Sequence, residues 1–336
     1  MLKAQESDSF DLGPDWFELL VRSALPDGFV PAYYVLWRDD QPRCVFPVFT
    51  TNLGVTSQTN FYTSLFRPAL AEQVKAIELV PLIGRMMADT KAPWIRLDAM
   101  DPAHPSFAVL LSALSLAGLS AHRFFAFGNW YLPSRDLAFD DYLQGLKSRV
   151  RNTLMRRQKK FHADGKGRTE IFVCEASVHN IVDAWQSVYA ASWKRPEPYP
   201  AFVPELVRLC AQRGWLRMGI AYLGDTPIAA QLWIVNAGRA AIYKLAYHEK
   251  FRQYSAGTIL TAEMIAYVLQ KDRVHEVDYL IGDDAYKKDW MSRRRQRCGV
   301  IAFNLRTLKG LSGAALQYLG DAKRRFAKLM NRAGDS

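Results

Sequence analysis

The sequence predicts an α/β protein with mixed (α+β) sheets, built from two successive halves. Its 336 residues exceed what one small hydrophobic core usually organises, and 49% of them are apolar, enough for a sizeable core. Strand-like and helix-like segments alternate along the chain in a similar order in both halves. We therefore expect one domain over residues 1–135, a second over 136–308, and a separate C-terminal helix over 309–336.

The net charge of +11 favours anionic partners such as phosphorylated cofactors, nucleotide-linked substrates, anionic lipid or nucleic acid. The four cysteines, at positions 44, 174, 210 and 298, lie too far apart for a metal motif or a dense disulfide framework. The first residues lack the apolar core of a signal peptide, and the longest apolar run, 107–121, is too short to span a bilayer. We expect a cytoplasmic protein that binds no metal.

The first half is predicted to contain two strands, then a helix, a strand, a helix and a long strand. These segments are Ala32–Trp37, Cys44–Phe49, about 70–88, Trp94–Asp98, about 105–118 and about 121–132.

A basic helix is predicted to begin at Asp140. Apolar residues from Tyr142 to Leu154 recur on one face, and lysines and arginines between 147 and 160 cover the rest. This face can bind a phosphate-rich acceptor, nucleic acid or membrane, or it can simply be solvated above an apolar stripe. The helix lacks interleaved aromatic residues, and the sequence has no complete nucleic-acid-binding motif, so no specific nucleic-acid partner is expected.

The second half shows a longer and more regular series of segments. The expected order is strand, helix, helix, three strands, helix, strand, short helix and strand. The segments are Thr169–Cys174, Val178–Trp193, Val203–Gln212, Trp215–Leu223, Ile228–Val235, Ala240–His248, Thr258–Leu269, Glu276–Leu280, a short helix from Ala285, and Gly299–Asn304.

A loop of small residues, Arg252–Gly257, opens the helix that begins at Thr258. The N–H groups of a first helical turn lack partners, and the helix dipole favours negative charge there, so such a loop can bind phosphate. The alternative is an ordinary connection in which Gly257 is a permissive residue.

The pattern Arg252-x-x-Ser255-x-Gly257 resembles the Arg/Gln-x-x-Gly-x-Gly/Ala pyrophosphate loop of the GNAT acyl-CoA N-acyltransferases, with Ser255 in place of the first glycine. The order of elements in the second half is also similar to the GNAT order, and the first half resembles a degenerate copy without an anion loop. Two such halves in tandem resemble the FemAB-type arrangement. The chain is most similar to the CelD/BcsL-type family, through the segments 192–194, 227–231, 244–247, 254–258 and 282–290.

This resemblance implies a bound acetyl-CoA or other acyl-CoA. Leu245, Ala246 and Tyr247 would contact the pantetheine arm and the thioester carbonyl through the backbone. The pyrophosphate would lie against the loop, with charge from Arg252 and N–H groups from Ser255, Ala256, Gly257 and Thr258.

Acyl transfer also requires that the amine lose a proton and that the thiolate receive one. An acid such as Asp278 or Asp283 would act as the general base, Tyr286 as the proton donor and Lys287 as an oxyanion or phosphate partner. Alternatively, Asp283 or Asp284 caps a short helix and Lys287 is solvated. Three further residues either line the acceptor pocket or pack in the core: Gln231, Trp233 and Tyr243.

The C-terminal segment, Leu311 to Arg332, has apolar and basic faces and is expected to be an amphipathic helix that contacts anionic membrane or packs on the protein. The expected function is N-acyl transfer to an amine, such as an amino sugar or an envelope or exopolysaccharide precursor. The alternatives are a FemAB-like aminoacyltransferase that uses charged tRNA, and a non-catalytic protein of polysaccharide assembly or the membrane surface.

Overall fold

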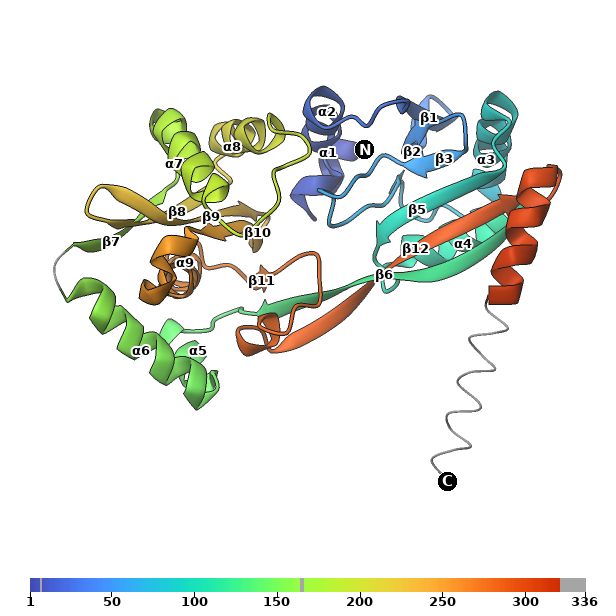
Figure 1. Ribbon diagram of the computed structural model, residues 1–336. Coiled ribbons are helices and arrows are strands. Elements are labelled where there is room, and N and C mark those ends of the chain that lie inside the picture. The colour runs from blue at the N-terminus through green and yellow to red at the C-terminus, as the bar shows by residue number, and fades with distance from the viewer. Residues whose placement is uncertain (7, 164–165, 321–336) are drawn as a thin grey trace. The chain divides into compact units, whose positions relative to one another are not determined.

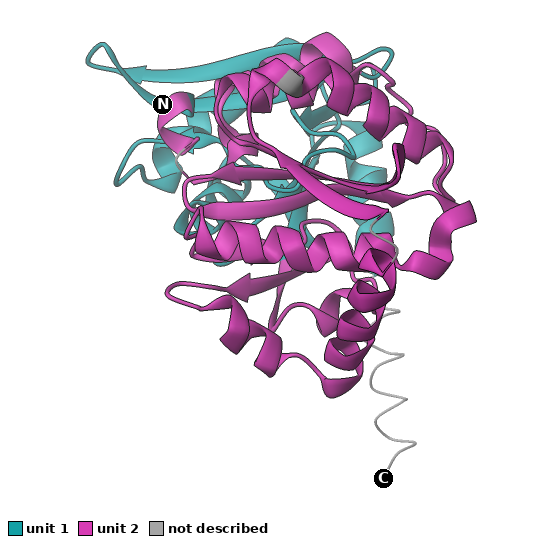
Figure 2. Ribbon diagram, turned by 90° about the vertical axis from the view of Figure 1, so that its left-hand side faces the viewer, with its two compact units in different colours: residues 1–2, 26–126, 297–336 teal, residues 3–25, 127–296 magenta. Residues whose placement is uncertain are grey.

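The computed structural model describes residues 1–6, 8–163 and 166–320, and it divides into two compact units. Unit 1 comprises residues 1–2, 26–126 and 297–336, and unit 2 comprises residues 3–25 and 127–296 (Figure 2). The predicted mixed α/β class is confirmed. The units are not contiguous in sequence, and the domain division expected between residues 135 and 136 remains a prediction.

Unit 1 is a mixed sheet packed with helices. Its strands lie in the order β1-β2-β3-β5-β12-β6, and β4 pairs with β2. Buried side chains of α3, such as Ile83 and Met86, and of α4, such as Leu110 and Leu114, contribute to its core. The elements are β1 (Val30–Arg38), β2 (Gln41–Thr50), β3 (Val55–Ser57), β4 (Ala69–Leu70), α3 (Ala76–Thr90), β5 (Trp94–Met100), α4 (Pro105–Leu116), and parts of β6 (Leu119–Pro133) and β12 (Arg293–Asn304) (Figure 1). Residues 127–133 of β6 and 293–296 of β12 belong to unit 2.

The last strand differs from expectation. The sequence order suggested that Gly299–Asn304 completes the second half, but β12 pairs antiparallel with β5, placing Val300 opposite Leu97 and Ala302 opposite Ile95. Residues 308–320 are helical and contact unit 1, where the rings of Tyr318 and His122 lie 4.7 Å apart. The rest of the predicted C-terminal helix, 321–336, lies outside the described residues.

The strands of unit 2 belong to the same mixed sheet and lie in the order β6-β11-β10-β9-β8-β7. Helix α9 covers one face of this sheet, while α7 and α8 cover the other (Figure 1). The elements are α1 (Leu2–Gln5), η1 (Phe10–Leu12), α2 (Pro14–Ser23), α5 (Phe139–Gly145), α6 (Ser148–His162), β7 (Gly167–Phe172), η2 (Glu175–Ser177), α7 (Val178–Ala190), α8 (Phe202–Gln212), β8 (Leu216–Leu223), β9 (Thr226–Asn236), β10 (Arg239–Tyr247), η3 (Glu249–Tyr254), α9 (Ala256–Gln270), β11 (Glu276–Asp278) and η4 (Lys287–Asp289).

The basic segment forms two helices rather than the single one expected. Helix α5 ends at Gly145, and Leu146 adopts an extended backbone with φ −69° and ψ 148° before α6 begins. Glycine is a poor helix former, which favours a break at this point. Leu154 and Phe161 are the buried residues of α6, and they join the core cluster that includes α9.

The pairing between β10 and β11 is short. The two strands are parallel neighbours only at Arg239–Ala241 and Glu276–Asp278, whereas β10 pairs with β9 as far as Tyr247. On the β11 side, the rest of β10 therefore has no strand partner among the described residues. Within residues 1–6, 8–163 and 166–320, no helix combines the length and the apolar character required to cross a bilayer.

Candidate active site

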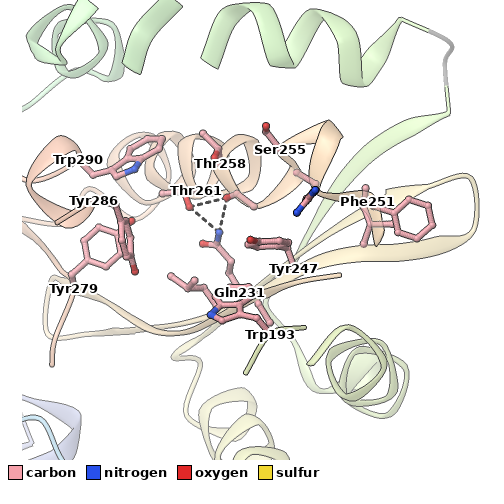
Figure 3. Close-up of a pocket in the computed structure, with 16 residues that line it drawn as sticks. Trp193, Gln231, Tyr247, Phe251, Ser255, Thr258, Thr261, Tyr279, Tyr286 and Trp290 are labelled. Carbon is pink, nitrogen blue, oxygen red and sulfur yellow. Dashed lines mark hydrogen bonds between the residues drawn. The ribbon is translucent and has the colours of Figure 1, made fainter. Parts of the chain in front are cut away.

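Unit 2 contains a cavity of about 410 Å³ at the end of β10 (Figure 3). Its walls come from β9, β10, the η3 loop, the first turns of α9 and the corner that follows β11. The lining residues are Trp193, Ile228, Gln231, Leu245, Ala246, Tyr247, Phe251, Arg252, Ser255, Ala256, Gly257, Thr258, Thr261, Tyr279, Tyr286 and Trp290. All eight residues predicted to contact the cofactor therefore lie around one space, together with Gln231 and Tyr286.

The loop before α9 presents two unsatisfied donors. The N–H of Ser255 donates to Arg252 O at 3.1 Å and that of Thr258 to Ser255 O at 2.9 Å. Among the described residues, the N–H groups of Ala256 and Gly257 have no hydrogen-bond partner. The predicted anion site thus narrows from four N–H groups to two, at the positive end of the α9 dipole and beside Arg252.

Ser255 has the left-handed conformation that glycine favours, with φ 55° and ψ 33°, and it makes no side-chain capping hydrogen bond. This is the position where the resembling loop pattern has glycine, so the backbone follows the pattern although the residue does not. Gly257 has no positive φ, so its backbone conformation does not require glycine. A Cβ added to Gly257 would meet the side chain of Tyr247 at 3.7 Å.

Helix α6 supports the same loop. Arg157 Nη1 donates to Gln253 O at 2.9 Å, and Gln253 follows Arg252 in the chain. The buried Nε of Arg157 has no hydrogen-bond partner among the described residues. The basic helix is therefore not only solvated, because one of its arginines holds the backbone next to the predicted anion site.

Of the three residues considered for the acceptor pocket, Gln231 lines the cavity, and Trp233 and Tyr243 do not. Gln231 Nε2 donates to Gly257 O at 2.9 Å and to Thr261 Oγ1 at 2.8 Å, which ties β9 to α9 beneath the cavity (Figure 3). Trp233 is fully buried and donates to Gln231 Oε1 at 2.9 Å. Tyr243 packs against the ring of Phe10, 5.9 Å away. Trp233 and Tyr243 therefore match the core-packing alternative.

Neither acid considered as a base lines the cavity. Asp278 is buried, accepts from Asn129 Nδ2 at 2.5 Å and from the N–H of Leu280 at 2.7 Å, and pairs with Arg295 at 2.5 Å. Asp283 accepts from Trp130 Nε1 at 2.8 Å and from the guanidinium of Arg294, whose hydrogen bond lowers the pKa of this carboxyl. Both carboxylates form ion pairs with arginines, so this geometry favours structural roles for them.

Tyr286 lines the cavity, and its side chain is about half-exposed. Its ring lies 5.8 Å from that of Tyr279 in an edge-on arrangement. Burial and then the charge of Asp284 raise the pKa of Tyr286 to about 12. The phenol thus stays protonated at neutral pH and is a weaker acid than an ordinary tyrosine.

Lys287 is buried rather than solvated. Its Nζ donates to Ile281 O at 2.6 Å and lies 3.3 Å from Asp284 Oδ2. Burial lowers its pKa, which Asp284 partly offsets. The ammonium holds the backbone of the corner that positions Tyr286, and it does not line the cavity.

Several lining residues were not assigned from the sequence. The ring of Trp193 lies 4.4 Å from that of Tyr247, tilted by 37°, and lines one side of the cavity, while Tyr279 and Trp290 line another. Trp193 belongs to a segment that carried the family resemblance, which was the available signal. Within the described part of the chain, no three His, Cys, Asp or Glu side chains are grouped as metal ligands are.

Comparisons with known proteins agree with this geometry. Residues 148–288, which lie within unit 2, match the family model described as an acetyltransferase (GNAT) domain. No curated protein sequence matches the chain.

Solved structures with a similar fold include FemX, at 10% identity and a TM-score of 0.58, covering 86% of this chain and 90% of that one. L-PGS from Bacillus licheniformis is similar at 10% identity and a TM-score of 0.51, covering 90% of this chain and 96% of that one. At these identities the similarity shows the fold alone. The cavity-bearing segment 148–288 is thus similar to an acetyltransferase (GNAT) domain.

Proposed function

We propose that unit 2 transfers an acyl group, most simply acetyl, from acyl-CoA to an amine. The observation that carries the proposal is the single cavity that brings the unpaired end of β10 next to the anion loop and Tyr286. An acyl-CoA whose thioester lies along Leu245–Tyr247 would place its pyrophosphate at the N–H groups of Ala256 and Gly257. Arg252 would add a positive charge to these donors.

In this reaction the amine nitrogen forms a bond to the acyl carbon, the carbon–sulfur bond breaks, and the thiolate leaves. The nitrogen loses its proton to solvent, and solvent protonates the released thiolate. Tyr286 lines the same cavity and would meet the departing sulfur. With a pKa of about 12, the phenol lies roughly 3.5 units above an ordinary thiol, so complete proton transfer is uphill in the empty site. Its proposed role is therefore to donate a hydrogen bond to the thiolate as charge develops there.

The acceptor class rests on the resemblance to the CelD/BcsL-type family, which suggests an amino sugar or a nucleotide-linked envelope precursor. Because Asp278 and Asp283 are ion-paired outside the cavity, we assign no general base. The reaction would take place on the inner side of the membrane, where acyl-CoA is available.

One observation favours a second candidate, the FemAB-like transfer of an aminoacyl group from charged tRNA. The basic helix α6 contacts the anion loop through Arg157 and Gln253, so a long polyanion could lie along both. A non-catalytic role would not require the two N–H donors of the loop to face the same cavity as Tyr286.

Calorimetric titration of the full-length protein with acetyl-CoA tests these candidates. We expect micromolar binding with one molecule per chain, because the loop pattern occurs once in the sequence. Binding of charged tRNA alone would support the second candidate, and binding of neither would leave a non-catalytic role. A stoichiometry of two per chain would contradict the assignment of the site to unit 2.

A further inference from the structure

A second group of charged side chains lies on the face of β10 opposite the cavity. Leu245 pairs with Gln231, and both line the cavity, so the neighbouring Lys244 points to the other face of the sheet. There Lys244 Nζ lies 2.6 Å from Glu197 Oε1. Only 13% of the lysine side chain and 10% of the glutamate side chain are exposed, so this ion pair is largely desolvated.

Glu197 belongs to the loop between α7 and α8, which also carries Lys194. Prolines at 196, 198 and 200 fix φ at three positions of this loop, so it presents its side chains with little conformational freedom. Lys194 Nζ lies 5.8 Å from the ring centroid of Trp193 and 6.0 Å from that of Tyr189. Since Trp193 lines the cavity, Lys194 stands at its margin, on the face that carries α7 and α8.

The lysines of this group outnumber its carboxylates. Lys244 is paired with Glu197, and Lys287 is paired with Asp284. Lys194 has no hydrogen bond or ion pair to its ammonium among the described residues. Burial, followed by the charge of Lys244, lowers the pKa of Lys194 to about 8, and the carboxylates of Glu197 and Asp284 offset only part of this shift. A partly buried ammonium without an ion-pair partner is costly, and a ligand anion would remove that cost.

We propose that Lys194 binds an oxyanion, either a phosphate or a carboxylate, carried by the acyl acceptor. The site rests on the proposed function, because it places the acceptor on the sheet face opposite the acyl-CoA cavity. The amine would then reach the thioester through the opening between β10 and β11, where pairing stops at Ala241 and Asp278. The pair Lys244–Glu197 would hold the loop without competing for the anion, because each charge already has a partner.

The first test needs neither cofactor nor acceptor. Full-length protein is labelled with a trace amine-reactive reagent at pH 7, and each lysine is quantified by mass spectrometry. Inorganic phosphate, acetate and chloride are compared at equal ionic strength. At this pH roughly 10% of a lysine with pKa 8 is unprotonated, against roughly 0.04% of an ordinary lysine, so Lys194 should react fastest.

We expect phosphate, acetate or both to slow the labelling of Lys194 by at least about tenfold, because a bound anion raises its pKa and shields it. The exposed Lys271 at the end of α9 is the internal control and should not change. Protection by phosphate alone would identify a phosphorylated acceptor, and protection by acetate alone a carboxylated one. If neither anion slows Lys194 relative to Lys271, the proposal is wrong, whatever the result with acetyl-CoA.

The second test uses a panel of amines that bear a phosphate, a carboxylate or no charge. Lys194→Met should raise KM for the preferred anionic amine by about tenfold or more, while Lys194→Arg should largely preserve it. Lys271→Met is the matched control for loss of a lysine. A wild-type preference for uncharged amines would also overturn the proposal.

Discussion

Replacing Gly257 by valine tests the cofactor site most directly. A Cβ at this position would meet Tyr247 at 3.7 and 3.8 Å, an ordinary contact, and the two methyl groups of valine would then occupy the cavity beside the anion loop. Gly257 lies in the first turn of α9, and valine has the better helix propensity by a few tenths of a kcal/mol. The substitution should therefore leave the fold intact.

Gly257→Val should weaken CoA binding, because the valine side chain would block a backbone donor to the pyrophosphate. Losing one charge-assisted hydrogen bond between a backbone N–H and the pyrophosphate costs about 1.5–3 kcal/mol, which corresponds to roughly 10- to 150-fold weaker CoA binding. Isothermal calorimetry measures the dissociation constant, and thermal unfolding confirms that the variant is folded.

Gly84→Val is the matched control, because Gly84 also lies within a helix, α3 of unit 1, and a Cβ there would meet nothing within 4 Å. It should bind CoA as the wild type does. Unchanged CoA affinity in folded Gly257→Val would refute the assignment of this loop to the pyrophosphate.

Three further substitutions or deletions test other parts of the molecule. Tyr286→Phe should lower kcat by about 10²-fold with little change in acyl-CoA binding, and wild-type kcat in that variant would end its assignment to the leaving thiolate. Ser255→Gly should raise the thermal midpoint by a few degrees, because it relieves about 1 kcal/mol of left-handed strain without losing a capping hydrogen bond; a lower midpoint would show that the serine side chain stabilises the loop. Deletion of residues 321–336, which spares the helical residues 308–320, should reduce co-sedimentation with anionic vesicles at low salt, and equal sedimentation would exclude the membrane role.

The order of elements was predictable because hydrophobic periodicity reports local structure. The strands around β10 and the helix after Ser255 lie close to their predicted positions. The pairing partner of β12 was not predictable in this way, because a strand pattern records which residues are buried and not which strand lies beside it. The break at Gly145 was missed because the apolar spacing continues on both sides of it.

The site was predictable where backbone geometry defines it and less so where side chains do. Ser255 keeps a glycine-like conformation, so the loop pattern located the backbone turn that opens α9 despite the substitution. Asp283 illustrates the opposite case, because its partner Arg294 is eleven residues away and no spacing rule links them. The charge environment of Lys194 was equally hidden, since it depends on β10 and on the corner after β11.

The brief contact between β10 and β11 leaves part of a strand edge exposed within a sheet. Such an edge is usually an aggregation hazard, and proteins cover it. The pantetheine arm contains two amide groups, so a bound acyl-CoA along Leu245–Tyr247 would serve as a short additional strand and complete the sheet. The ligand would then act as a structural component of unit 2. At a free acyl-CoA concentration of about a hundred times the dissociation constant, binding would stabilise the fold by about 2.7 kcal/mol.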